Sequence, residues 1–185
     1  MGKQYDALTD KLTEFIKAQK VFFVATAPLS GDGLVNLSPK GYDSFAVLGP
    51  KEVAWLDVGG SGIETMAHLK ENGRITIMFC AFDGSALILR LYGEGEAVQF
   101  DDPRFPELLE LFPSFDKARA IVKVKLTRIQ DSCGWGVPFL EFREERDQLK
   151  RYADNPDRDA DFWAEKYRTA NAQSLDGLTG IERPK

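Results

Sequence analysis

The sequence predicts an α+β fold, mainly β, built around an antiparallel sheet that curves into a small barrel. Most of its apolar segments are short and rich in β-branched and aromatic residues, which is typical of strands. Turn signals join successive strands as hairpins more often than helices join them as crossovers, and this favours antiparallel pairing. Helical periodicity is confined to short segments at the start, between strands and in a charged tail.

The first half of the chain predicts a helix followed by four strands. Apolar residues recur at helical spacing over residues 6–19, where Thr9 or Asp6 caps the start of the helix. The strands are expected at residues 21–27, 34–40, 43–48 and 52–57. Gly31-Asp32-Gly33 is a hairpin signal between the first two strands, and Gly49-Pro50 ends the third.

The second half adds two helices, three strands and a charged tail. A helix over residues 63–71 is closed by Asn72-Gly73, and Asp101-Asp102-Pro103 starts the next helix. The strands are expected at residues 74–82, 86–100 and 120–130, the first two joined by a turn at Asp83-Gly84. Residues 140–170 predict one or two charged helices, and the residues from Ser174 onward are expected to be poorly ordered.

The composition excludes several classes of protein. The chain has 185 residues, which fits one domain, and 43% of them are hydrophobic, which is enough for a core. Its net charge of −5 argues against a nucleic-acid or membrane-surface binder, which would need a basic face. No apolar run approaches the ~18 residues that span a bilayer, and residues 1–20 contain no secretory apolar core. We therefore expect a cytoplasmic protein that keeps Cys80 and Cys133 as free thiols rather than a disulfide.

Several common types of catalytic site are missing from the sequence. His68 is the only histidine, which excludes a histidine-rich metal site. The two cysteines lack zinc-site spacing, and no metal ligand set is expected. Neither a phosphate loop ending in Gly-Lys-Ser/Thr nor a dinucleotide-binding glycine pattern occurs. His68 is expected to be a satisfied surface or core residue, and Cys133 a small buried hydrophobe.

Two features could together form an anion site. Gly59-Gly60-Ser61-Gly62 lies between a predicted strand and a predicted helix, where backbone N–H groups and the helix N-terminus favour an anion. The same glycines also fit a plain tight turn. Lys40 ends a predicted strand, where it is either solvated or completes a phosphate cradle beside that turn.

Two further residues stand in unusual surroundings. Arg90 lies within the apolar strand segment 86–92, and a buried arginine without an anionic partner is costly. It therefore either faces solvent on the barrel exterior or meets a ligand. Trp135 lies between two glycines, where it either packs as a plug or offers a flat face to a planar ring.

Five segments carry a recognisable order of motifs. They are Asn36–Phe45, Val53–Asp57, Gly60–Thr65, His68–Phe79 and Leu89–Gly95. In this order they resemble the pyridoxamine 5′-phosphate oxidase-like, FMN-binding split-barrel family over residues 10–130. The segment Cys133–Phe139 resembles one subgroup of that family.

The resemblance implies a six-stranded antiparallel split β-barrel with flanking helices and a helical C-terminal tail. It also implies a homodimer that holds FMN at the subunit interface. On this basis residues 1–140 form the FMN-binding domain, and residues 141–185 form a helical extension packed on the same domain. The extension has too few apolar residues to be stable alone, so it packs on the barrel or across the dimer.

The resemblance also implies roles for individual residues. Lys40 matches the lysine that ends the family's first FMN strand, whereas Val35 stands where the family has an arginine. Residues 60–65 replace the family's serine-arginine-lysine phosphate motif, which leaves two hydroxyls and one backbone N–H as candidate donors. Arg90 falls where the family places a polar residue at the isoalloxazine edge. The candidate cofactor-binding residues are Asn36, Leu37, Ser38, Lys40, Ser61, Gly62, Thr65, Arg90 and Trp135.

The leading hypothesis is an FMN-dependent oxidoreductase that acts on a small-molecule substrate or reductant not identified by the sequence. The FMN phosphate carries close to two negative charges and needs a lysine, hydroxyls and backbone donors. Arg90 is the candidate for stabilising the reduced, anionic flavin. No catalytic residue is named, because the cofactor carries the chemistry. The alternatives are a non-catalytic protein that binds or stores flavin or another ring cofactor, and a fold in which Arg90 and Trp135 are only structural.

Overall fold

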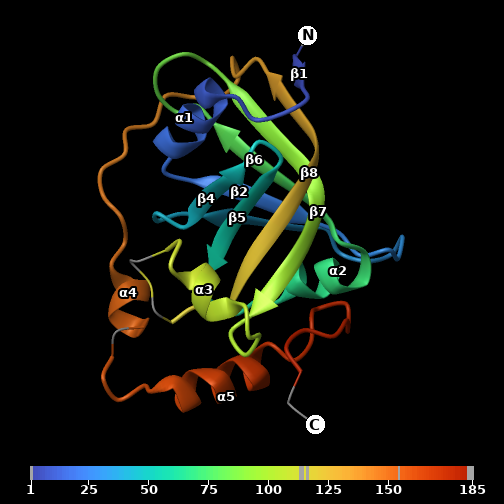
Figure 1. The fold of residues 1–185 in the computed structure, drawn as a ribbon, viewed down its shortest axis with the longest axis vertical. Helices are drawn as coiled ribbons and strands as arrows, with labels where there is room; N and C mark the ends of the chain where they lie inside the picture. The colour runs from blue at the N-terminus through green and yellow to red at the C-terminus, as the bar shows by residue number, and fades with distance from the viewer. Residues whose placement is uncertain (1, 113–114, 116, 154, 183–185) are drawn as a thin grey trace.

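The computed structural model describes residues 2–112, 115, 117–153 and 155–182. In chain order its elements are β1 (Gln4–Tyr5), α1 (Asp10–Ala18), β2 (Phe22–Thr26), β3 (Asn36–Lys40), β4 (Phe45–Gly49), β5 (Glu52–Asp57), α2 (Glu64–Asn72), β6 (Arg74–Cys80), β7 (Ile88–Gln99), α3 (Phe105–Leu109), β8 (Ala120–Ser132), α4 (Gln148–Ala153) and α5 (Ala160–Ala170). The long strands β7 and β8 run through the middle of the molecule, with α1 near one end of them and α2 near the other (Figure 1).

The eight described strands form one antiparallel sheet. Their order is β3-β2-β6-β7-β8-β5-β4, and the short β1 pairs with β8 beside this path. The sheet curves around its inner face but stays open, with β3 and β4 at its two ends (Figure 1). The predicted α+β split-barrel class is confirmed. The sheet has eight strands rather than six, and one of the additions, the two-residue β1, is too short to give a periodic signal.

The inner face of the curved sheet encloses the main core. Alternate residues of β2 point inward, so Phe22 and Val24 are buried while Phe23 lies on the outer face. Trp55 of β5 is fully buried, and its ring stands edge-on to Phe22 with centroids 6.2 Å apart. The apolar face of α1 packs against the same core.

The helix ends follow the local sequence. The Thr9 side chain accepts a hydrogen bond from the backbone N–H of Leu12 at 3.3 Å, so Thr9 rather than Asp6 caps α1. Gly73 closes α2 with a φ of 69°, a left-handed conformation that costs glycine little. The helix predicted from Asp101-Asp102-Pro103 begins only at Phe105 and is short.

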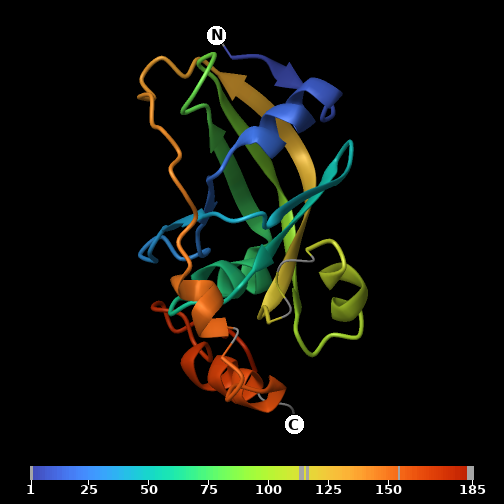
Figure 2. The same cartoon turned by 90° about the vertical axis from the view of Figure 1, so that its left-hand side faces the viewer.

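The segment after β8 corrects one prediction. Residues 133–147, called the strap below, contain no helix, although helix was expected from residue 140. The strap runs down the outside of the sheet to α4 (Figure 2). Its charged stretch, residues 143–147, offers no apolar stripe that a helix could bury, and tertiary packing supplies most helix stability. The division of the chain at residue 140 stays a prediction.

The end of the described chain is ordered against α2, contrary to the expectation for residues from Ser174 onward. Gln173 and Thr179 form an isolated β-bridge, and Ile181 is buried in a cluster with residues of α2 and α5. The Lys70 ammonium donates to the carbonyl of Gly180. The apolar side chain of Ile181 gives this segment burial that its polar sequence did not predict.

The two cysteines are both free. Cys80 is buried in β6, and burial raises the pKa of its thiol despite the charge of Arg90. Cys133 is exposed rather than buried as predicted, because it follows the end of β8 at the start of the strap. Over the described part of the chain, no helix is both long and apolar enough to cross a membrane.

Candidate functional site

Strand β3 presents three of the predicted site residues on one face. Asn36, Ser38 and Lys40 are partly buried, whereas Leu37 and Pro39 point to the other face and are exposed. The strand pairs with β2 so that Lys40 lies opposite Phe22 and Asn36 lies opposite Thr26. The polar face of β3 therefore looks toward the inner side of the sheet.

Asn36 joins this strand to the start of α2. Its side-chain amide donates to Thr26 Oγ1 at 3.2 Å and to Thr65 Oγ1 at 2.9 Å. The two hydrogens of the amide are thereby used. Since Thr65 Oγ1 is the acceptor in this contact, the contact leaves the hydroxyl hydrogen of Thr65 for another acceptor. Asn36 and Thr65, both predicted as site residues, are thus in direct contact.

The hydrogen-bond chain continues from Thr26 to His68. Thr26 is buried, so its hydroxyl hydrogen needs an acceptor, and Nδ1 of His68 lies 3.0 Å away. Which of the two groups donates in this contact depends on the imidazole tautomer, that is, on whether the proton is on Nδ1 or on Nε2. Nε2 is buried without a hydrogen-bond partner and lies 3.8 Å from a carboxylate oxygen of Asp176. His68 therefore belongs to a buried polar chain behind Asn36 and Thr65.

Lys40 points inward rather than into solvent. Its ammonium lies 4.9 Å from the centroid of the Trp55 ring, in a cation–π geometry. It is also close enough to Asp57 at the end of β5 to help lower the pKa of that carboxyl. Lys40 at the end of β3 and Asp57 at the end of β5 therefore lie near each other.

Asp57 and Arg119 form a buried ion pair under the turn. Arg119 Nε donates to Asp57 Oδ2 at 3.0 Å, and both side chains are almost fully buried. Burial by itself would raise the pKa of Asp57, but the charges of Arg119 and Lys40 and the hydrogen bonds from Arg119 and Gly59 outweigh it. The pKa of Asp57 consequently lies below its ordinary value.

The Gly59–Gly62 turn uses its carbonyls within the chain. The Gly60 carbonyl accepts from Arg119 at 3.4 Å and from the Asn171 side-chain amide at 3.2 Å, and the Ser61 carbonyl accepts from the same amide. Gly59 has a φ of 88°, and a Cβ there would lie 2.9 Å from the Tyr167 ring, so both strain and crowding require glycine. These contacts fix the turn against the end of α5.

The backbone N–H groups of the turn, unlike its carbonyls, are available to a ligand. Ser61 and Gly62 are exposed, and the N-cap residue of α2, Ile63, gives no side-chain hydrogen bond to the first turn. The first N–H groups of a helix have no partners within the helix and attract anions. With the Thr65 hydroxyl and the ammonium of Lys40, this arrangement has the donor set that a phosphate needs.

Arg90 and Trp135 do not join this cluster within one chain. The β6–β7 and β2–β6 registers place Arg90 on the same outer face as Met78 and Phe23, opposite to the face of Lys40. Its guanidinium donates to Ser132 Oγ at 2.9 Å. Trp135 is 87% exposed in the turn at the start of the strap. Because it is so exposed, Trp135 does not pack as a plug within its own chain.

Several residues of the site could not be predicted from the sequence. Thr26, His68 and Arg119 sit in or beside apolar segments, where a single polar residue is a weak signal. Asp57 ends a strand of buried residues two positions before Gly59, and a charged residue in such a position predicts a partner for its carboxylate. Over the described residues, no cluster of three or more histidine, cysteine or acidic side chains is placed to hold a metal ion.

Comparisons with known proteins agree with this architecture. The family model described as pyridoxamine 5′-phosphate oxidase matches residues 8–133. A protein of Aspergillus flavus, described as the pyridoxamine 5′-phosphate oxidase family protein ustO, is 37% identical over 193 residues, which cover 96% of this chain and 77% of that protein.

Two solved structures share the fold. HupZ of Group A Streptococcus aligns with a TM-score of 0.54 at 21% identity, over 66% of this chain and 91% of that one. A Lactobacillus delbrueckii protein, provisionally described as a pyridoxamine 5′-phosphate oxidase, aligns with a TM-score of 0.52 at 18% identity, over 69% and 98%. At these identities the two structures establish the fold alone.

Proposed function

The chain belongs to the pyridoxamine 5′-phosphate oxidase family, and from that premise we propose that it binds FMN and serves as an FMN-dependent oxidoreductase for a small-molecule substrate. The observation that carries the proposal is the contact between Asn36 and Thr65 at the uncapped start of α2, with Lys40 directed to the same side of the sheet. Bound flavin would supply the transfer of a hydride or of electrons.

The FMN phosphate is held at the first turn of α2. The Thr65 hydroxyl and the backbone N–H groups of Ser61 and Gly62 donate to its oxygens, and Lys40 contributes a positive charge. Arg119 adds a second cation beneath the turn, where Asp57 and, in the first turn of α2, Glu64 are the two carboxylates. Lys40 and Arg119 are the cations that would take the place of the family's arginine, at whose position this chain has Val35.

The buried polar chain positions these donors. His68 holds the Thr26 hydroxyl, Thr26 and Asn36 are hydrogen-bonded, and Asn36 in turn holds Thr65. A hydroxyl that is already fixed in direction loses less entropy when it binds a ligand. Ser38 lies on the same face of β3 as Asn36 and Lys40 and would flank the flavin there. Leu37 points to the opposite face, where its side chain would meet only a flavin bound at the interface with a second copy.

A homodimer completes the site. The outer face carries exposed apolar side chains, among them Val35 (75% exposed) and Leu37 (64% exposed), and an apolar surface of this kind favours a partner. Arg90 and Trp135 also lie outside the barrel, away from Lys40 of their own chain. In a homodimer the second copy would bring them to the flavin ring at the interface, where the positive charge of the arginine would favour reduction of the flavin.

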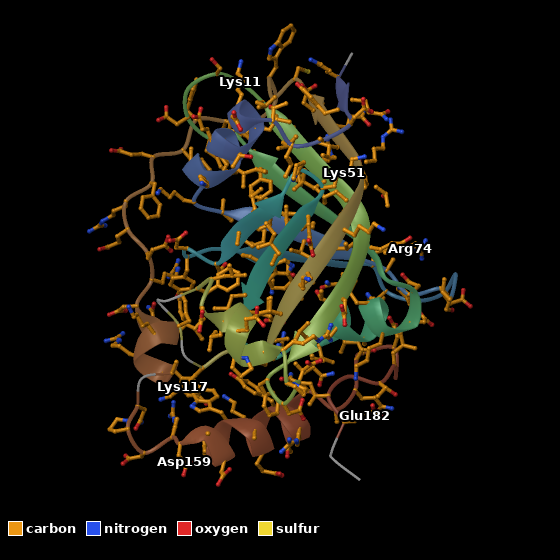
Figure 3. The ribbon with its side chains drawn as sticks, in the orientation of Figure 1. Lys11, Lys51, Arg74, Lys117, Asp159 and Glu182 are labelled. Carbon is orange, nitrogen blue, oxygen red and sulfur yellow. The ribbon has the colours of Figure 1, made fainter. Side chains whose placement is uncertain are left out.

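An FMN titration with matched lysine variants tests the phosphate site. Lys40→Met keeps an apolar stem on Trp55 but removes the charge, so it should weaken FMN binding about tenfold or more. Lys11→Met is the control, because Lys11 is exposed on α1, at the other end of the molecule from α2 (Figure 3). Flavin fluorescence quenching measures both. Equal affinities in the native chain and Lys40→Met would contradict the proposed site.

Anaerobic mixing with NADH or NADPH tests the oxidoreductase part of the proposal. Loss of the visible flavin absorbance, followed by its return in air, is the expected result. Flavin that binds but is not reduced by any nicotinamide or chemical donor would favour the alternative, a non-catalytic flavin-binding or storage protein.

A further inference from the structure

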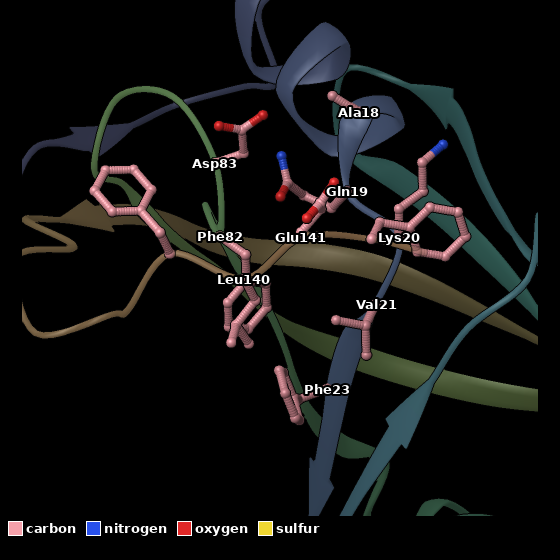
Figure 4. Close-up of a pocket in the computed structure, with 11 residues that line it drawn as sticks. Ala18, Gln19, Lys20, Val21, Phe23, Phe82, Asp83, Leu140 and Glu141 are labelled. Atoms are coloured by element: carbon pink, nitrogen blue, oxygen red, sulfur yellow. The ribbon is translucent and has the colours of Figure 1, made fainter. Parts of the chain in front are cut away.

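A second cavity lies on the outer face of the sheet, at the end of α1. It has a volume of about 760 Å³ and is bounded by residues 18–21, by Phe23, by the turn after β6 and by residues 139–142 of the strap. Leu140 and Phe82 point toward the same space as Val21 and Phe23 (Figure 4). None of its lining residues belongs to the proposed phosphate site.

The strap that covers this cavity is held in place at several points. The backbone N–H of Leu140 donates to the carbonyl of Phe82 at 2.9 Å, and the Tyr42 hydroxyl donates to the carbonyl of Arg146 at 2.8 Å. Between them the Lys20 ammonium lies 5.6 Å from the centroid of the Phe142 ring. The cavity wall is therefore built by specific contacts on both sides rather than by a loose loop.

The chemistry of the wall favours an aromatic, uncharged occupant. Four phenylalanines line the cavity, and Phe139, Leu140 and Phe142 of the strap are exposed. Covering such surface is favourable, and aromatic side chains stack on planar rings. The charged lining residues are Lys20, Asp83 and Glu141, two carboxylates to one ammonium, which disfavours an anion.

The size and position of the cavity suit a substrate of a flavin bound at the homodimer interface. Its volume falls within the range of about 300–1,000 Å³ that is usual for small-molecule sites. Its floor residue Phe23 lies opposite Pro39 of β3 and Met78 of β6, and Met78 lies opposite Arg90. The cavity thus shares the outer face of the sheet with Arg90, the arginine proposed to reach the flavin at the homodimer interface, whereas Lys40 points to the opposite face.

We propose that this cavity binds an uncharged aromatic small molecule, and that this molecule is the substrate of the flavin. The second half of the proposal rests on the FMN function proposed above. The phenylalanines and the strap residues of the cavity select the substrate, and they disfavour substrates that bear a phosphate or carboxylate. Such a preference separates this chain from an enzyme acting on a phosphorylated substrate.

Two fluorescent probes test the cavity without flavin. N-phenyl-1-naphthylamine is uncharged, whereas 8-anilinonaphthalene-1-sulfonate has the same rings with a negative charge. The native chain should bind the uncharged probe saturably, one per chain, and at least tenfold more tightly than the sulfonate. Absence of saturation, or equal affinity for the two probes, would overturn the proposal.

Variants locate the binding. Val21→Trp fills the cavity and Leu140→Asp places a charge in its exposed wall, so each should weaken binding of the uncharged probe tenfold or more. Leu175→Asp is the matched control, since Leu175 is exposed in the C-terminal segment and should leave binding unchanged. Binding that survives both cavity variants would overturn the proposal. Affinity that falls as protein concentration rises would show instead that a second copy occupies the cavity.

Parallel FMN titrations separate the two proposals. Loss of probe binding in Leu140→Asp with FMN affinity unchanged is the expected pattern. An unaltered probe site in a native chain that takes up no FMN would contradict the flavin function and the substrate role together. Native FMN affinity in a chain that binds no probe would contradict the cavity alone.

Discussion

Asn36 shows how one polar side chain at the edge of a sheet can fix the start of a helix. Its amide reaches Thr26 on β2 and Thr65 on α2, so three elements meet at a single group. A buried hydroxyl that loses its partner keeps its full desolvation cost, which makes such a group more important to stability than one hydrogen bond implies.

Replacing Asn36 by alanine tests this role. Asn36→Ala removes both donors and should lower the free energy of unfolding by about 1–3 kcal/mol. It should also weaken FMN binding, because Thr65 is no longer oriented. Urea denaturation measures the stability, with Leu29→Ala as the control, since Leu29 is as exposed as Leu37 but lies outside the proposed site. Equal losses in the two variants would contradict the positioning role.

Asp57 gives the site a defined dependence on pH. Its pKa is lower in the folded chain than the ordinary value of about 3.9, so it contributes stability above that value. The contribution is lost as the pH falls through the folded pKa. Asp57→Asn leaves Arg119 buried without its partner and should cost about 3–5 kcal/mol at neutral pH.

The acid side of the stability curve distinguishes this contribution from general damage. Below about pH 4 the native chain should lose stability more steeply than Asp57→Asn, which no longer has this carboxyl to protonate. Asp6→Asn, at an exposed position near the N-terminus, is the control and should follow the native slope. Urea denaturation at a series of pH values measures the slopes, and parallel curves for native and Asp57→Asn would refute the assignment.

Helix α5 acts as a support for the glycine-rich turn. Trp163 and Tyr167 pack together, with ring centroids 5.6 Å apart, in a cluster that includes Ile63 beside the start of α2. Asn171, which follows the helix, holds the carbonyls of Gly60 and Ser61. Burial raises the pKa of the Tyr167 phenol, consistent with a ring that is enclosed rather than solvated.

Truncation of Trp163 measures how much the packing of α5 contributes to the stability of the fold. Trp163→Ala should lower the free energy of unfolding by about 3–5 kcal/mol, because it empties a buried ring site. Phe162→Ala is the matched control, since Phe162 is 42% exposed on the neighbouring position of the same helix. Thermal unfolding compares the two variants, and similar shifts in Tm would contradict the packing of Trp163 against Tyr167 and Ile63.

The sequence predicted elements best where periodicity was long and burial uniform. The strands β2, β5, β6, β7 and β8 were located because their β-branched and aromatic runs are bounded by turns. The strap and the segment from Ser174 onward were predicted wrongly, because their conformation depends on tertiary contacts such as those of Leu140 and Ile181. Local propensity carries no information about such contacts.

The site could be predicted only in part, for a similar reason. Lys40, Asn36 and Thr65 lie on segments whose order identifies the family, so they could be selected from the sequence. The partners that hold them, His68 on α2 and Arg119 at the start of β8, are distant in sequence and become visible only when the sheet is assembled. Arg90 was expected at the same site, but the sheet register puts it on the other face.

At the scale of the whole molecule, apolar side chains on the outer face of the sheet, among them Val35 and Leu37, are exposed in a single chain. We predict that Leu37→Asp, which puts a charge on that face, shifts the protein from dimer to monomer and weakens FMN binding together with it. Leu175→Asp is the control, with a comparably exposed leucine in the C-terminal segment. Sedimentation velocity measures the state. A native chain that is monomeric at all concentrations, with FMN bound, would contradict the shared site.

The most direct test of the account compares FMN with riboflavin, which has the same ring and no phosphate. If Thr65, Lys40 and the first turn of α2 hold the phosphate, the native chain should bind FMN about a hundredfold more tightly, since two charge-assisted hydrogen bonds contribute about 1.5 kcal/mol each. Thr65→Val should remove much of that difference while leaving riboflavin binding unchanged. Equal affinities of the native chain for FMN and riboflavin would contradict the phosphate site and the function built on it.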